Sequence, residues 1–105
     1  MIITTTNSIQ GREITQYLGV ITDFIYAKIY DTKGLSFRDS LNRDKIYERS
    51  EEGIDAAKQE VLKKLEAKAK EMGAHAIVGV TMDVEVINEG FKLGISSMGT
   101  AVVLR

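Results

Sequence analysis

One long amphipathic helix, predicted from about Glu51 to Met72, is the strongest constraint on how this chain folds. Its apolar residues recur at helical spacing and form one stripe, made of Ile54, Val61, Leu65 and Met72 with Ala57, Leu62 and Ala69 beside them. Acidic residues stand four positions before lysines at Glu60–Lys64 and Glu66–Lys70, and Gly73 suits a left-handed C-cap. A helix of this kind needs an apolar surface to cover.

The segments on both sides of this helix have the composition of β-strands. Residues 2–6 and Ile14–Tyr30 are rich in β-branched and aromatic residues, and the second run has apolar residues on both faces. Ala76–Ile87 and Phe91–Leu104 predict an antiparallel hairpin whose turn is Asn88-Glu89-Gly90. In the last strand the apolar side changes after Ile95, which predicts a bulge or bend near Ser96 and Ser97.

These elements together predict an α+β fold, with a small antiparallel or mixed sheet of three to four strands packed by one long helix. At 105 residues the chain is expected to form a single domain over residues 1–105. The charged segment between Asp31 and Gly53 is harder to interpret, and one or two short helices with a loop are expected there. One helix stripe covers one face of such a sheet, so the other apolar face predicts that copies of the chain cover each other.

Composition excludes several kinds of site and partner. The chain has no cysteine, which removes disulfides, thiolate nucleophiles and soft-metal thiolate sites together. Its formal charge is −1, without the basic excess that nucleic-acid or anionic-membrane binding requires, so neither partner is expected. The first ten residues do not have the pattern of a targeting segment, and no run is apolar enough for a membrane span, so we expect a cytoplasmic protein.

Several short motifs, in order along the chain, resemble those of the YbjQ-like family of bacteria and archaea, which is often labelled heavy-metal-binding. In the first part they are Ile3-Thr4-Thr5-Thr6, Ile9-Gln10-Gly11-Arg12-Glu13-Ile14 and Tyr17-Leu18-Gly19-Val20-Ile21-Thr22. In the second part they are Met72-Gly73-Ala74, Ala76-Ile77-Val78-Gly79-Val80, Asp83-Val84-Glu85 and Ser97-Met98-Gly99-Thr100-Ala101-Val102. The resemblance covers roughly residues 1–30 and 54–105.

The resemblance implies a subunit that closes into a ring, a homopentamer with long helices around a strand-lined centre. Three positions depart from the family pattern. In the stretch before the long helix, only Arg43 and Tyr47-Glu48 correspond to the family's residues, at altered spacing. Val84 stands where the family usually has a tyrosine, and His75 stands where it usually has an acid or asparagine.

Asp83 and Glu85 are the candidate site residues, because residues two apart on a strand point to the same face, about 6.5–7 Å apart at the backbone. Solvated or salt-bridged acids are the ordinary interpretation of such a pair. Catalysis is disfavoured, since no further groups suggest a substrate grip or separated pKa values. The alternative is a divalent metal ion, held where ring symmetry gathers copies of these carboxylates.

His75 is the only imidazole and is the third candidate metal ligand, although a surface histidine in a loop is the simpler interpretation. A soft metal is disfavoured because the chain has no thiolate. The sequence thus predicts a homo-oligomeric protein of binding or structural type, with a small-molecule or metal ligand between subunits. Metal binding through Asp83, Glu85 and His75 is the alternative, and an enzyme acting on a small molecule is the weakest one.

Overall fold

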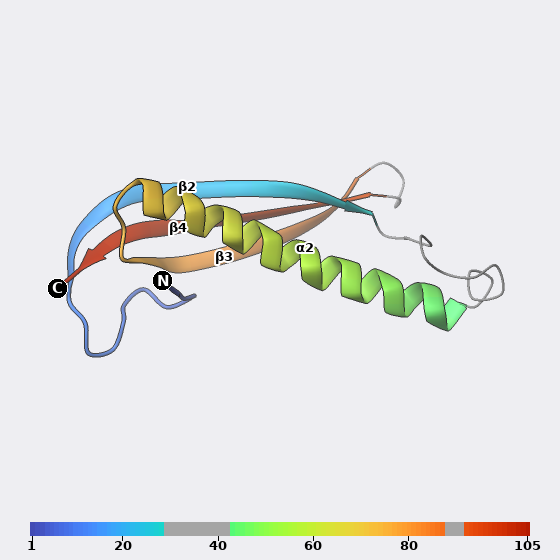
Figure 1. Ribbon diagram of the computed structural model, residues 1–105, viewed down its shortest axis with the longest axis horizontal. Helices are drawn as coiled ribbons and strands as arrows, with labels where there is room; N and C mark the ends of the chain where they lie inside the picture. The colour runs from blue at the N-terminus through green and yellow to red at the C-terminus, as the bar shows by residue number, and fades with distance from the viewer. Residues whose placement is uncertain (29–42, 88–91) are drawn as a thin grey trace.

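The computed structural model describes residues 1–28, 43–87 and 92–105, and it has an α+β fold in which one helix lies across a four-stranded mixed sheet (Figure 1). The strands are β1 (Ile2–Ile3), β2 (Ile14–Lys28), β3 (Ala76–Ile87) and β4 (Lys92–Leu104), and the helix is α2 (Arg43–Glu71). Their order in the sheet is β1-β3-β4-β2; β1 is parallel to β3, and the other neighbours are antiparallel. The predicted fold class is confirmed, whereas the predicted turn at Asn88–Gly90 and the first part of the middle segment lie outside the described residues.

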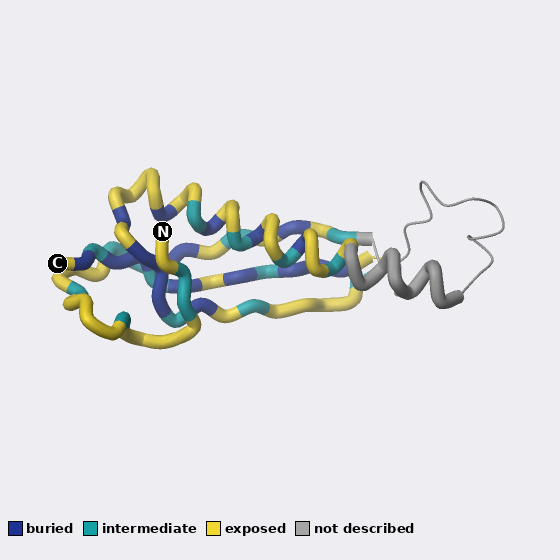
Figure 2. Tube along the Cα trace, turned by 60° about the horizontal axis from the view of Figure 1, so that its bottom comes forward, coloured by how far each residue is buried: buried dark blue, intermediate teal, exposed yellow. Residues whose placement is uncertain are grey.

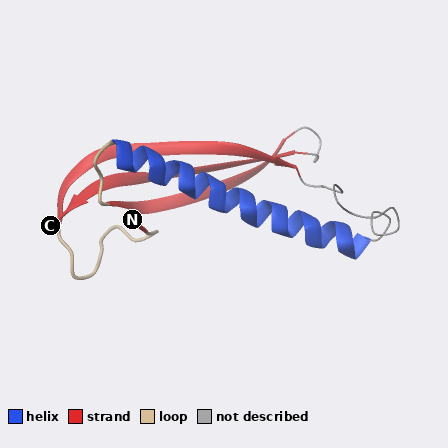
Figure 3. Ribbon diagram, viewed as in Figure 1, coloured by secondary structure: helices blue, strands red, loops and turns tan. Residues whose placement is uncertain are grey.

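Helix α2 begins at Arg43, eight residues before the predicted start, and it extends past the end of the sheet (Figure 3). The expectation of one or two short helices with a loop between Asp31 and Gly53 was therefore wrong for residues 43–52, which belong to α2, and its first part lies outside the described residues. Residues 43–52 are mostly arginine, lysine and glutamate, which favour a helix by propensity alone, without an apolar stripe. In the described ranges no helix is long and apolar enough to cross a bilayer.

The C-terminal end of α2 is the left-handed cap that the sequence predicts. Gly73 has a φ of 80°, its N–H donates to the carbonyl of Lys70, and the N–H of Ala74 donates to the carbonyl of Ala69. This pair of bonds is a Schellman motif, which satisfies carbonyls that the helix end leaves free. The chain thereby turns directly into β3.

The main core lies between α2 and the sheet (Figure 2). It comprises two adjoining clusters, the first of Ile21, Leu65, Ala69, Ala74, Ile77, Val80 and Ala101, and the second of Ile25, Ala57, Val61 and Ile95. The helix residues among them are members of the predicted stripe. Of the other stripe residues, Ile54 and Leu62 are partly buried, and Met72 is 40% exposed because the cap turns the chain away there.

A second, smaller core lies on the opposite face, at the end of the sheet near both termini. It consists of Ala76, Val78, Val102 and Leu104, with Ile9 and Ile14 packed against it. The apolar side of β4 therefore changes because α2 covers one face of the strand and the N-terminal segment covers the other face farther along. The predicted bulge at Ser96 and Ser97 was wrong for this reason.

The strand pairing has register shifts in β2, between Ile14 and Gln16 and between Tyr17 and Gly19, and one in β3. Val78 pairs with Thr100 and Thr81 pairs with Met98, so β3 has one extra residue there, and Gly79 adopts a φ of 61°. Such a bulge moves a strand's side chains to the other face. Val78 and Val80, predicted to share one side, consequently belong to the cores on opposite faces.

Candidate functional site

The face of the sheet turned away from α2 carries large apolar side chains that no described part of the chain covers. Residues paired across the strands share a face, so the pairing of Phe24 with Ser96, and of Ser96 with Asp83, places all three on this side. We call this surface the open face. Its exposed apolar residues are Tyr17 (67% exposed), Val20 (68%), Phe24 (45%), Tyr26 (57%) and Met98 (50%).

Two of these rings are fixed against each other. Phe24 and Tyr26 form an edge-to-face pair with centroids 4.7 Å apart, and the Nζ of Lys92 lies 5.0 Å from the centre of the Tyr26 ring. Edge-to-face and cation–π contacts each favour one arrangement of the side chains. The open face therefore presents a partly ordered aromatic surface.

The size of this patch is that of a functional surface. Taking 150–250 Å² for each of the three aromatic side chains, with smaller areas for Val20 and Met98, the five residues at the exposures above expose on the order of 500 Å². The largest apolar patch on a typical monomer is about 300–600 Å² and is often an interaction site. The open face is thus the strongest candidate for a functional surface.

Asp83 and Glu85 lie on the open face, beside the aromatic surface. Asp83 shares a row with Ser96 and Phe24, and Glu85 shares the next row with Gly94 and Tyr26. Both side chains are exposed. The structure thus places the two carboxylates together at the margin of the apolar patch.

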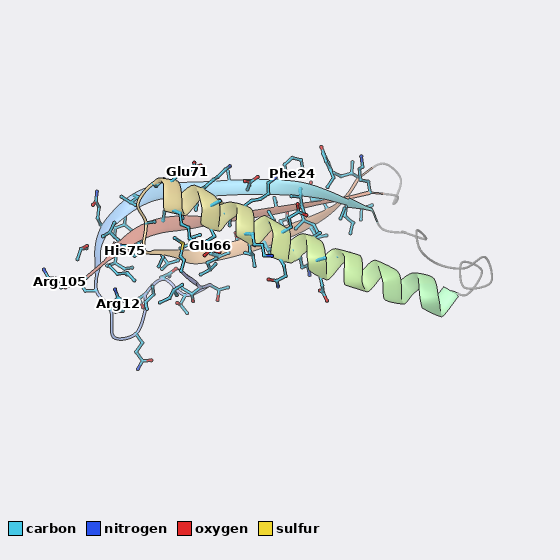
Figure 4. All side chains as sticks on the ribbon, viewed as in Figure 1. Arg12, Phe24, Glu66, Glu71, His75 and Arg105 are labelled. Atoms are coloured by element: carbon cyan, nitrogen blue, oxygen red, sulfur yellow. The ribbon has the colours of Figure 1, made fainter. Side chains whose placement is uncertain are left out.

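His75 lies at the other end of β3, eight residues before Asp83, which corresponds to about 26 Å along a strand. Figure 4 shows His75 near Arg105 and far from Phe24. The strand pairing puts Phe24 in the same row as Asp83. Its Nδ1 accepts a hydrogen bond from the N–H of Leu104 at 3.0 Å and lies 3.1 Å from the carbonyl oxygen of the same residue. Within one chain, His75 extends the pairing of β3 with β4 and is not near the two acids.

A charged cluster at the outer edge of β2 was not predicted. Asp23 lies between the buried Ile21 and Ile25, and its carboxylate pairs with Lys64 at 3.6 Å and Lys68 at 3.3 Å. Lys70 pairs with Glu66 as expected, at 3.4 Å, whereas Lys64 reaches Asp23 rather than Glu60. The position of Asp23 within an apolar strand was a sequence signal that this acid has a charged partner. The identity of the partners depends on how α2 docks on the sheet, which the sequence does not show.

The electrostatics of Asp23 follow from this geometry. The N–H of Phe24 donates to its carboxylate at 2.8 Å, and this bond, followed by the nearby Lys68 and Lys64, holds the pKa of Asp23 below 3.8 despite partial burial. The same lysines donate to the backbone of β2, Lys68 to the carbonyl of Thr22 at 2.7 Å and Lys64 to that of Phe24 at 3.3 Å. The cluster therefore closes this stretch of the strand's outer edge.

The comparisons with known proteins concern the whole chain. A family model described as "Putative heavy-metal-binding" matches residues 1–105. The chain is 40% identical over 117 residues to a UPF0145 protein of Anoxybacillus flavithermus (100% of this chain, 99% of the relative), and 39% identical over 108 residues to one of Corynebacterium jeikeium (100% of both). A crystal structure of a Pediococcus pentosaceus protein, titled as of unknown function and in the DUF74 family, superposes with a TM-score of 0.61 at 26% identity (100% of this chain, 98% of that one).

The residues of a single chain do not fit a soft heavy metal. The sequence has no cysteine and one histidine, and that histidine is distant from the two acids of the open face. Among the residues that the structure describes, no three histidine or acidic side chains are grouped as a metal site would require.

Proposed function

Because this chain belongs to the YbjQ-like family of UPF0145 proteins over its whole length, we propose that it is one subunit of a homo-oligomeric ring with a binding or structural role. The resemblance favours five subunits. Neighbouring copies cover each other's open faces, and any ligand lies between subunits, where several chains contribute side chains. The proposal includes a cytoplasmic location, and it ranks an enzyme acting on a small molecule as the weakest alternative.

The open face carries this proposal. Its area, on the order of 500 Å² from five side chains, approaches the roughly 800 Å² that each partner buries in a standard interface. Helix α2 packs on one face of the sheet, so burial of the open face requires a neighbouring subunit.

The chemistry of the open face narrows the class of ligand. Phe24 and Tyr26 supply an aromatic surface, and Asp83 and Glu85 supply negative charge at its margin. This combination favours a small molecule with a flat apolar part and a cationic or hydrogen-bond-donating group. It disfavours anionic ligands, which the two carboxylates would repel.

Native mass spectrometry of the untagged protein tests the proposal. A ring of about five subunits is expected, and retained mass beyond the polypeptide would reveal the class of ligand. A bare ring would favour a structural role. A spectrum that contains only the single subunit at micromolar concentration would refute the proposal.

A hard divalent cation held by Asp83 and Glu85 is the second candidate, because the two carboxylates share one exposed face. Oxygen ligands suit magnesium, calcium and manganese, and copies of the pair brought together by symmetry would supply the number of ligands that one chain lacks. Titration calorimetry should then give heat with one of these ions, or with zinc, that is lost in Asp83→Asn/Glu85→Gln. The control is Glu60→Gln/Glu71→Gln on the exposed side of α2; absence of heat with every ion excludes the cation site.

A further inference from the structure

The outer edge of β3 is paired along the first half of the strand only. Ile2 and Ile3 pair with Ala76 and Ile77, and the last bonds on this side run from the N–H of Gly79 to Thr6 and from the N–H of Val80 to Thr4. On the inner side β4 stays paired as far as Ile87. From Thr81 onward, the described residues include no strand that pairs with the outer edge.

The direction of the free backbone groups follows from the bond at Val80. Its N–H points outward, to Thr4, and successive N–H groups of a strand alternate between its two sides. The N–H groups of Met82, Val84 and Val86 therefore point away from the sheet. They form an edge of seven residues, Thr81 to Ile87, to which another strand can bind.

The opposite edge of the sheet is treated differently. On β2, Lys64 and Lys68 bind the carbonyls of Phe24 and Thr22, which is a common way to keep an edge strand from pairing. In the described part of β3 no side chain binds the free edge, and Val84 (42% exposed) and Val86 (68%) are uncovered beside it. An exposed apolar edge strand of this kind favours pairing with another chain.

Charge determines which strand can pair there. In an antiparallel pair, residues that face each other lie on the same face of the sheet, so two copies of β3 centred on Asp83, Val84 or Glu85 would set acid against acid. Like charges placed opposite each other are destabilising. Residues 14–21 of β2 carry no charged side chain, and their backbone makes no described bond to a side chain of α2, unlike the carbonyls of Thr22 and Phe24.

A hollow at the beginning of the free edge adds a place for side chains. It has a volume of about 220 Å³ and is lined by Ile3, Thr4, Thr5, Leu62, Val80, Thr81 and Met82. Added strands commonly gain affinity from main-chain bonds and specificity from such pockets beside the edge. The hollow and the free edge are continuous at Thr81 and Met82.

We infer that a second copy of this chain adds the first half of its β2 strand, residues 14–21, to the outer edge of β3 from Thr81 to Ile87, in a head-to-tail contact. The inference rests on the self-assembly proposed above and adds an edge-to-edge contact to the packing of the open faces. Head-to-tail contacts between different surfaces generate a ring when the rotation closes, whereas a β3–β3 contact would give a twofold dimer. Asp83 and Glu85 act in this scheme as the charges that prevent the twofold pairing.

Amide hydrogen exchange of the assembled protein tests this contact directly. The N–H groups of Val84 and Val86 should exchange at least about tenfold more slowly than those of an unpaired edge, because the added strand accepts their hydrogen bonds. Fast exchange of both groups within an intact assembly would overturn the inference and leave self-assembly standing. A protein that is monomeric overturns both.

Two substitutions at one position complement the exchange measurement. Val84→Pro removes an outward N–H and spares the pairing with β4, so it should dissociate the assembly while circular dichroism stays native; Val84→Thr keeps the N–H and should assemble. If Val84→Pro fails to fold, wild-type exchange still decides. Since the chain has no cysteine, Val84→Cys offers one thiol per subunit, and ready oxidation to a dimer linked through this position would demonstrate twofold β3 pairing and overturn the head-to-tail contact.

Discussion

Asp23 shows how a single residue can connect the helix to the sheet. Its carboxylate accepts the N–H of Phe24 and pairs with two lysines of α2, and these contacts depress its pKa. A carboxyl group whose pKa is lower in the folded state stabilises the fold above its unfolded pKa. That contribution is lost as the pH falls through the folded value, hence below about 3.8.

Asp23→Asn should therefore lower the free energy of unfolding at pH 7 by about 1 kcal/mol, since its partners are half-exposed lysines and one backbone N–H. It should also flatten the loss of stability between neutral pH and pH 3. Urea denaturation at a series of pH values measures both effects. Asp55→Asn, an exposed acid of α2, is the control, and equal pH profiles for the two variants would contradict the prediction.

Some of the candidate residues could be placed from the sequence, and others could not. Asp83 and Glu85 could be placed on one face because the period of a strand is two, and the open face does carry both of them. The role of His75 could not be predicted, because its Nδ1 binds the backbone of Leu104, which follows it by twenty-nine residues. The partners of Asp23 likewise depend on docking, for which strand periodicity gives no information.

At the scale of elements, close packing across the β3 bulge makes one glycine essential. A methyl group on Gly99 would lie 2.7 Å from Cγ2 of Ile77 and 3.0 Å from Cγ2 of Val80. Gly99→Ala should therefore destabilise the fold by about 1–3 kcal/mol, the usual cost of overpacking. Gly53→Ala, in α2 with nothing within 4 Å, should stabilise it by up to about 1 kcal/mol. Urea denaturation at one fixed protein concentration compares them, and equal midpoints would contradict the assignment.

The elements themselves could largely be predicted, but their limits and irregularities could not. The stripe from Ile54 to Ala69 identified the helix, whereas its start at Arg43 depends on propensity rather than on apolar spacing. The change of apolar side in β4 was interpreted as a bulge. It arises instead because α2 covers one face of β4 and the N-terminal segment covers the other face farther along. The periodicity of the strand does not reveal the path of the N-terminal segment.

At the scale of the whole molecule, a single charged substitution on the open face tests whether this face is buried in the assembly. Val20 is 68% exposed, so Val20→Lys should change the free energy of unfolding of the subunit by less than about 0.5 kcal/mol. Within an interface the same charge should weaken association at least about tenfold. Sedimentation velocity over a dilution series measures this, with Ala67→Lys on the exposed side of α2 as control. Equal sedimentation of the two variants would show that the open face is not buried.

The position of β4 has a consequence for how the protein is made. β4 pairs with both β2 and β3, yet it follows both of them in the chain, so β2 emerges from the ribosome long before any described partner strand exists. Pairing between segments so far apart in sequence is slow to form, and unpaired strands are prone to aggregate in the meantime. Tyr17, Val20, Phe24 and Tyr26 are exposed throughout that interval. Yield in cells should therefore depend on translation rate and chaperone supply more than the stability of the finished protein would suggest.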